Sequence, residues 1–300
     1  MKTPLPRLPL PGKAGRVMTV ETRDAKKRIQ FLKSLPTLPG MLDQISRAVE
    51  SHRFSASDIG KLISKDQVLT AKVLKLANSA FYGFSRKVGS LTQALVLLGF
   101  EVIKGLILTS AVFEMMKKKQ LGLWEHSLAV ALTTGLVAEM SPAIKERREE
   151  IALAGLLHDL GKVVIQIQLP HDAESVAELI EVEDMGTGRA EEEVLGFNHC
   201  QAGMWLAESW KLPLELTEPI RWHHTPLEAP NASLAAAAVH LADILVKGYG
   251  FTTSESVYVP PLQKQALKHL GLNLKAIETV IKMMPEKLGP DVTDSSLAPF

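Results

Sequence analysis

Apolar residues recur three or four positions apart along most of this 300-residue chain, which is the spacing that one face of an α-helix requires. Between Asp66 and Asn78, for example, the apolar positions are Leu69, Val73, Leu74 and Leu76. No segment shows the sustained alternation of apolar and polar residues that is typical of a strand, and no long repeat recurs. The pattern therefore predicts an all-α fold.

Capping residues and glycines mark the ends of several predicted helices. Ser57 and Asp58 precede the helical pattern of residues 59–63, and Ser90 precedes the pattern that starts at Leu91. Gly99 is expected to separate this helix from the next one. Asn198 is expected to cap a helix that runs from His199 to Trp210.

The predicted helices fall into two groups, with a boundary at the charged run Lys117–Lys119. Residues 1–20 are rich in proline, and we expect a disordered lead there. We expect an N-terminal helical part over residues 21–120 and a second helical part over residues 121–250. Residues 251–300 are expected to form a C-terminal helical extension.

Composition excludes several classes of partner. Aromatic residues make up only 5% of the chain, which favours helix over strand. The net charge of +1 provides no field to attract nucleic acid or an anionic membrane, so we expect neither as a partner. Cys200 is the single cysteine, which excludes an internal disulfide and is consistent with a reducing compartment. With no signal-peptide pattern at the start of the sequence, a cytoplasmic location is expected.

The strongest chemical signal is a histidine and an aspartate side by side in an apolar helical run. His158 and Asp159 follow Leu153–Leu157, and Gly161 and Lys162 come directly afterwards. Burying an imidazole and a carboxylate is costly unless a partner pairs with them. A metal ion that prefers nitrogen and oxygen ligands is one such partner. The alternative is a His–Asp pair that caps a helix end.

Further residues of the second half that can bind metal come from separate predicted helices. With the central pair, the candidate ligands are His126, His158, Asp159, His199, His223, His224 and Asp243. Five histidines and two aspartates could hold two ions in the core of a helical bundle, with Asp159 bridging them. Because consecutive helical residues point about 100° apart, His158 and Asp159 could instead approach one ion from adjacent directions. Lys162 would suit a substrate phosphate or an oxyanion, although it could equally be solvated.

Each histidine alone also has a simpler interpretation. His126 would be a half-exposed residue near a helix start, and His199 a first-turn residue beside Cys200, which we expect to be a small buried hydrophobic residue. His240 lies three residues before Asp243, and we favour a role in the core or in supporting a ligand. The remaining histidines are expected to face solvent; they are His52, His171 and His269.

The order of these residues resembles the HD superfamily of metal-dependent phosphohydrolases. Within it, the sequence is most similar to HDOD (HD-related output domain) proteins across roughly residues 28 to 245. The first-half motifs that carry this resemblance are Leu35-Pro36-Thr37-Leu38-Pro39, Asp66 to Ser79, and Ser90 to Gly99. The resemblance implies an HD-like helical bundle preceded by an N-terminal helical subdomain. His158–Lys162 and the paired His223-His224 also resemble HD-GYP cyclic-di-GMP phosphodiesterases, but the Gly-Tyr-Pro of that family is absent from Thr225–Pro230.

The resemblance implies two hypotheses for function. The first is a cytoplasmic signal-transduction protein of HDOD type, which acts through a signalling protein or a nucleotide-type ligand and whose metal site is structural or regulatory. The second is a metal-dependent phosphohydrolase or phosphodiesterase acting on a nucleotide or cyclic dinucleotide, with Asp159 and Lys162 as catalytic residues. Both imply divalent transition metal, expected as two ions of Fe, Mn, Ni or Zn. A ligand position open to solvent would favour the enzyme, and a closed site would favour the scaffold.

Overall fold

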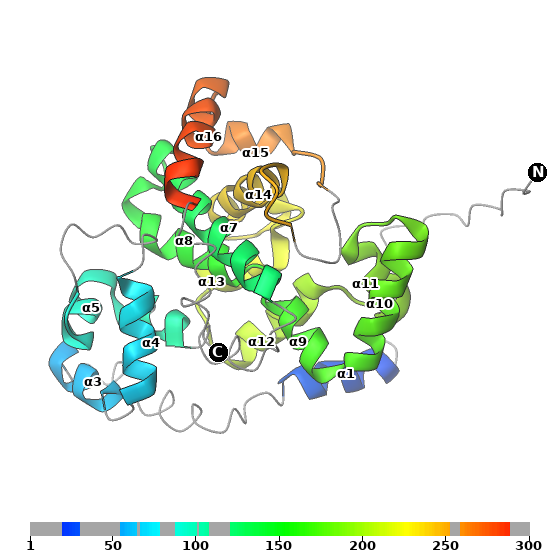
Figure 1. Cartoon of the computed structure of the whole chain (residues 1–300), viewed down its shortest axis with the longest axis horizontal. Helices are drawn as coiled ribbons and strands as arrows, with labels where there is room; N and C mark the ends of the chain where they lie inside the picture. The colour runs from blue at the N-terminus through cyan, green and yellow to red at the C-terminus, as the bar shows by residue number, and fades with distance from the viewer. Residues whose placement is uncertain are drawn as a thin grey trace, which may run out of the picture.

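The computed structural model describes residues 20–30, 55–64, 67–78, 88–100, 102–107, 121–252 and 259–288. These residues form fourteen α-helices and two short 3-10 helices, and they contain no strand (Figure 1). The all-α prediction is therefore confirmed. The predicted lead up to Thr19, the motif at Leu35–Pro39 and the run Lys117–Lys119 lie outside the described residues.

Besides a helical stretch at residues 102–107, the described residues of the first half of the chain form four short helices. They are α1 (Val20–Gln30), α3 (Ala56–Ile63), α4 (Gln67–Ala77) and α5 (Leu91–Leu98). The predicted cap of α5 is confirmed, because the Ser90 side chain accepts a hydrogen bond from the Gln93 N–H and Gly99 ends the helix with a φ of 79°. The predicted start of α3 was wrong. The helix begins at Ala56 and Ser55 is its cap, because the Ser55 hydroxyl accepts from the Asp58 N–H at 3.3 Å and Asp58 Oδ2 accepts from the Ser55 N–H at 3.0 Å.

The second half is built around α7 (Leu121–Met140), a helix with apolar residues on every side. Such a helix must be covered all round. α7 packs against α8 (Arg148–Leu157), α14 (Ser233–Gly248) and α16 (Leu274–Leu288). The remaining elements of this half are η3 (Lys145–Arg147), α9 (Leu160–Gln168), α10 (Pro170–Glu183), α11 (Thr187–Leu195), α12 (His199–Ser209), α13 (Leu214–Trp222), η4 (Pro226–Glu228) and α15 (Lys264–His269).

Helices α10 and α11 form a hairpin at one side of the molecule (Figure 1). Val176, Ile180 and Ala190 make a small apolar cluster inside this hairpin, separate from the main core. The hairpin reaches the rest of the fold through α9 and α12, and α1 also packs against these two helices. The turn between α10 and α11 therefore stands beside the first residues of α12.

The helices of the described segments include none that is long and apolar enough to cross a membrane.

Candidate metal centre

The helix ends of the second half bring the predicted ligands together. Sequence analysis placed His158 and Asp159 inside one helix, but α8 ends at Leu157 and α9 begins at Leu160. The His-Asp pair therefore forms the junction between two helices. His199 is the first residue of α12 and His223 follows the last residue of α13, while His126 and Asp243 come from the interiors of α7 and α14.

Asp159 lies between two groups of histidines. Its Oδ2 atom is 3.7 Å from His126 Nε2 and 3.3 Å from His158 Nε2. Its Oδ1 atom is 3.5 Å from His199 Nε2 and 3.8 Å from His223 Nε2. Each carboxylate oxygen therefore faces its own group of imidazoles, which is the arrangement that a bridging ligand needs.

The first group consists of His126, His158, Asp159 and Asp243. His126 Nε2 is 3.1 Å from Asp243 Oδ1, and His158 Nε2 is 3.8 Å from the same oxygen. These three atoms are buried without a hydrogen-bond partner. Several unpaired polar atoms at one buried point are costly. A metal ion would satisfy all of them, because nitrogen and oxygen ligands of one ion stand about 3 Å apart when the bonds are about 2.1 Å long.

The second group consists of His199, His223 and His224 beside Asp159 Oδ1. His199 Nε2 and His224 Nε2 are 3.1 Å apart. Cys200 is buried as predicted, but its Sγ atom lies 3.9 Å from the ring nitrogens of His223. Four residues each offer one ligand atom, and these four atoms lie within 4.8 Å of one another; the residues are His199, Cys200, His223 and His224. The second group therefore offers three imidazoles to a second ion, with the Cys200 thiol and Asp159 Oδ1 beside them.

Hydrogen bonds on the outer side of the rings fix the orientation of most of these histidines. His126 Nδ1 donates to the Phe251 carbonyl at 2.8 Å, and His158 Nδ1 donates to the Gly155 carbonyl at 2.8 Å. His223 Nδ1 donates to the Ile220 carbonyl at 3.1 Å. A carbonyl can only accept, so the hydrogen is on Nδ1 and the lone pair of Nε2 points into the cluster. This arrangement is typical of histidines that bind metal.

Sequence analysis missed Glu191, which holds His199. This residue of α11 is 2% exposed, and its Oε2 atom accepts from the His199 backbone N–H at 2.7 Å and from Nδ1 at 2.6 Å. Glu191 stands in a charged stretch of the sequence, Glu191–Glu193, with no local pattern that separates it from its exposed neighbours. Its role follows only from the packing of α11 against α12.

Two lysines balance the buried carboxylates. Lys162 Nζ lies 2.7 Å from Asp159 Oδ2, and Lys247 Nζ lies 2.7 Å from Asp243 Oδ2. The predicted solvated alternative for Lys162 is wrong, because this side chain is only 5% exposed. Burial opposes ionisation of Asp159, but its interactions with His158 and Lys162 lower the pKa of its carboxyl well below the usual range. Burial also lowers the pKa of His223 and His224, which favours the neutral imidazole that a metal requires.

Three of the other histidines, His240, His171 and His269, lie as the sequence indicated. His240 is buried and supports a ligand: its Nδ1 donates to the His223 carbonyl at 2.8 Å, while Nε2 accepts from the Gln263 N–H at 3.2 Å. His171 is almost fully exposed, and His269 is exposed with a hydrogen bond to the Ser233 hydroxyl. His52 lies outside the described residues.

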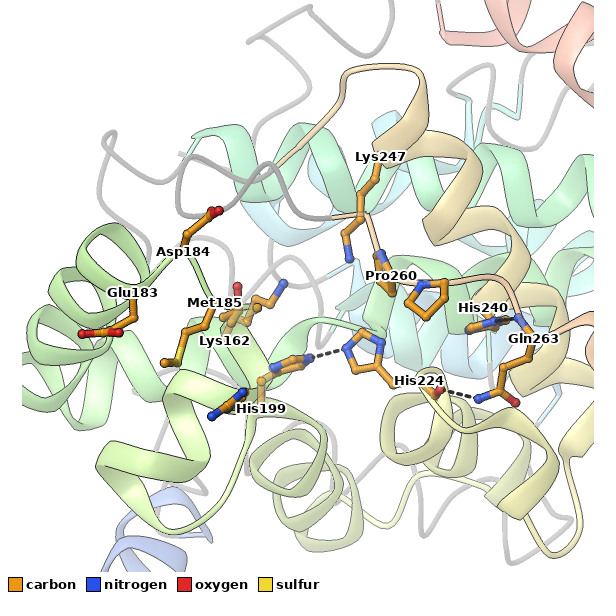
Figure 2. Close-up of a pocket in the computed structure, with 15 residues that line it drawn as sticks. Lys162, Glu183, Asp184, Met185, His199, His224, His240, Lys247, Pro260 and Gln263 are labelled. Atoms are coloured by element: carbon orange, nitrogen blue, oxygen red, sulfur yellow. Dashed lines mark hydrogen bonds between the residues drawn. The ribbon is translucent and has the colours of Figure 1, made fainter. Parts of the chain in front are cut away.

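One side of the cluster opens into a pocket of about 620 Å³. His199, His224, Lys162 and Lys247 form its inner wall, and Figure 2 shows these side chains facing the same space. The outer walls are the segment Glu183–Arg189, from the end of α10 to the start of α11, and residues 260–263. A molecule in this pocket would therefore touch the second group of histidines directly.

The fold and the cluster together define an all-α protein with a buried His–Asp centre that fits transition-metal ions. The comparison with family models is more specific: the HDOD domain model matches residues 35–226. The chain therefore belongs to the HDOD family.

Three similar proteins illustrate the relationship. A Treponema pallidum (strain Nichols) protein described as uncharacterized is 27% identical over 225 residues, covering 72% of this chain, and the chain spans only 42% of that relative. A solved HDOD domain protein of unknown function from Geobacter sulfurreducens is 25% identical with a TM-score of 0.61, and the match covers 88% of this chain and 98% of that one. A solved protein from Shewanella amazonensis SB2B, named as a candidate phosphohydrolase, has a TM-score of 0.62 at 24% identity, and the match covers 87% of this chain and 98% of that one.

Glu191→Gln tests whether Glu191 orients a ligand. The substitution keeps the size of the side chain but removes the negative charge that accepts from His199 Nδ1. Loss of such an outer partner typically weakens metal binding by about 10–100-fold. We expect this loss of metal affinity only for the ion at the second group. Competition with a chelator measures the affinity for each ion. Glu193→Gln, on the exposed side of the same helix, is the matched control, and equal losses in both variants would contradict this role.

Proposed function

We propose that this HDOD protein binds two divalent transition-metal ions and hydrolyses a phosphate ester. The observation that carries the proposal is the position of Asp159, whose two oxygens face separate groups of imidazoles beside an open pocket. When bound, such a pair of ions activates water and neutralises charge on a phosphoryl group. The pocket supports the hydrolase over the scaffold, because a closed site would leave no access for a substrate.

The residues of this chain have separate roles in the proposal. Asp159 would hold both ions, and the histidines of the two groups would complete the ligand sets. Lys162 lies beside Asp159 and lines the pocket, so its ammonium group would bind a phosphate oxygen near the centre. Its positive charge is secure, because the interaction with Asp159 outweighs burial and raises the pKa of Lys162.

The signalling role implied by the HDOD resemblance is a second candidate. The observation that favours it is the charge balance of the cluster, because Lys162 and Lys247 already pair with Asp159 and Asp243. A cluster with balanced charges could serve as a rigid element, through which binding of a ligand in the pocket changes the surface that a signalling partner recognises. The expected cytoplasmic location, and the expected lack of nucleic-acid and membrane partners, belong to both candidates and remain predictions.

Metal content and hydrolysis together test the proposal. The protein is purified, loaded separately with Fe, Mn, Ni or Zn, and analysed for metal and for hydrolysis of aryl phosphate monoesters and diesters. We expect two ions per chain in the wild type and one in each of two variants, His158→Ala for the first group and His223→Ala for the second. The matched control is His171→Ala, which removes an exposed histidine. A protein that binds two metal ions but hydrolyses none of these esters would contradict the hydrolase proposal, and the signalling role would remain as the candidate function.

A further inference from the structure

Two lysine ammonium groups reach the inner wall of the pocket from opposite sides. Lys162 comes from α9 and Lys247 from α14, and Figure 2 shows the two side chains pointing toward one another across the pocket. Each ammonium group has three N–H donors. The carboxylates of Asp159 and Asp243 each accept one of these bonds, so donors remain on both lysines for an anion between them.

The start of α11, which belongs to the outer wall, adds positive potential beside the second group of histidines. The helix follows Gly186, and no side chain caps its first N–H groups. Its first turn runs beside a candidate ligand, because a Cβ atom placed on Gly188 would lie 3.7 Å from His199 Cε1. A helix N-terminus carries about half a positive charge and favours phosphate.

The outer rim of the pocket carries two carboxylates, Glu183 and Asp184, and one arginine, Arg189, whose charge is paired with Glu193 outside the lining. Glu183 and Asp184 are exposed, line the pocket and stand at the C-terminal end of α10. A helix C-terminus is itself negative, so two carboxylates there are unfavourable for the helix. Asp184 also has a left-handed backbone, with a φ of 48°. The described lining residues include no Phe, Tyr or Trp on which a base could stack, and their apolar surface comes from Met185, Pro260 and Pro261.

We propose that the pocket takes a phosphate ester with a single phosphate group and a neutral or positively charged organic part. The phosphate lies between Lys162 and Lys247, and the organic part extends toward Glu183 and Asp184. This inference rests on the proposed function, since it places the phosphate beside the metal centre. A second phosphate would meet the carboxylates of the rim, so nucleoside triphosphates and cyclic dinucleotides are poor ligands. Lys247 is then a phosphate-binding residue that the sequence motifs did not indicate.

Calorimetry on the metal-loaded protein tests the charge preference. The ligands are adenosine 5′-O-thiomonophosphate and adenosine 5′-O-(3-thiotriphosphate), which have the same base and are hydrolysed slowly. We expect the monophosphate analogue to bind at least about tenfold more tightly at low salt, with a smaller ratio at high salt because exposed charges are screened. Equal binding of the two analogues, or binding of neither, would overturn the inference.

Variants of the rim and of the inner wall test each half of the pocket. Glu183→Gln with Asp184→Asn removes two negative charges, and asparagine tolerates the left-handed backbone at position 184. We expect this variant to lower the preference for the monophosphate analogue about three- to tenfold. The control is Asp172→Asn with Glu174→Gln, which makes the same charge change on exposed residues of α10 outside the pocket. An unchanged preference in the rim variant would contradict the role of the rim.

Lys247→Gln is expected to weaken binding of inorganic phosphate at least about tenfold while two ions per chain are retained. Lys268→Gln on the exposed side of α15 is the control. Unchanged phosphate binding, with metal content intact, would remove Lys247 from the site. Hydrolysis is measured separately on every variant. Normal binding without hydrolysis therefore counts against the proposed function and leaves the ligand class standing.

Discussion

Asp159→Asn is expected to remove both metal ions, although it changes one atom of one side chain. The two carboxylate oxygens face different groups of imidazoles, with 3.3 Å between Oδ2 and His158 Nε2 and 3.5 Å between Oδ1 and His199 Nε2. An amide presents one oxygen without a negative charge, and its NH₂ group offers no lone pair to a metal, so neither group of imidazoles keeps an anionic oxygen from residue 159. We expect a metal content near zero and a loss of hydrolysis of about 10³-fold or more. Elemental analysis and the ester assay measure the two effects.

This substitution also leaves Lys162 buried without its counter-ion. Breaking a buried ion pair by removing one partner typically costs about 3–5 kcal/mol, so the single variant could lose metal because it unfolds. The double variant Asp159→Asn with Lys162→Met removes the unpaired charge and separates the two causes. We expect it to melt cooperatively by circular dichroism and still to bind no metal. Retention of one ion per chain in either folded variant would contradict the bridging position of Asp159.

The candidate ligands could be predicted because their signal is local. Histidine and aspartate beside apolar helical runs, as at His158-Asp159 and Asp243, are unusual enough to be noticed one segment at a time. The all-α fold was predictable for the same reason, since helical periodicity repeats within each segment. What periodicity did not give was the break between α8 and α9, because Leu156 and Leu157 lead directly into His158 and Asp159 with no proline or glycine at the break itself.

Partners that act across helices could not be predicted. Glu191 reaches His199 only because α11 packs on the start of α12, and Phe251 accepts from His126 through its backbone, which any residue could provide. Lys247 lies four residues after Asp243, a spacing common to many surface pairs on helices. The contacts of Glu191 and Phe251 depend on tertiary packing, and the Lys247 contact cannot be told from an ordinary surface pair until the burial of Asp243 is known. The side chains that position the candidate ligands were therefore less predictable than the ligands themselves.

Gly161 is the residue where a single methyl group should damage the centre without touching a ligand side chain. Helices α9 and α12 cross at Gly161 and Gly203. A Cβ atom on Gly161 would overlap the His199 carbonyl group, lying 2.6 Å from its carbon, and would stand 2.7 Å from Gly203 N. These neighbours are backbone atoms, which cannot rotate away as a side chain would. The glycine that follows the His-Asp pair is therefore required by close helix packing.

Gly161→Ala is expected to destabilise the protein by about 3 kcal/mol or more, because overpacking against backbone forces two helices apart. The displaced carbonyl belongs to His199, so binding of the ion at the second group should weaken even where the chain remains folded. Gly135→Ala on α7 is the matched control, since its added Cβ would lie 3.7 Å from Ala152 Cβ, an ordinary contact. Alanine should stabilise that helix by roughly 0.5–1 kcal/mol. Urea denaturation measures both changes. A Gly161→Ala protein as stable as the Gly135→Ala control would contradict the close approach of α9 and α12, and with it the position of His199 beside Asp159.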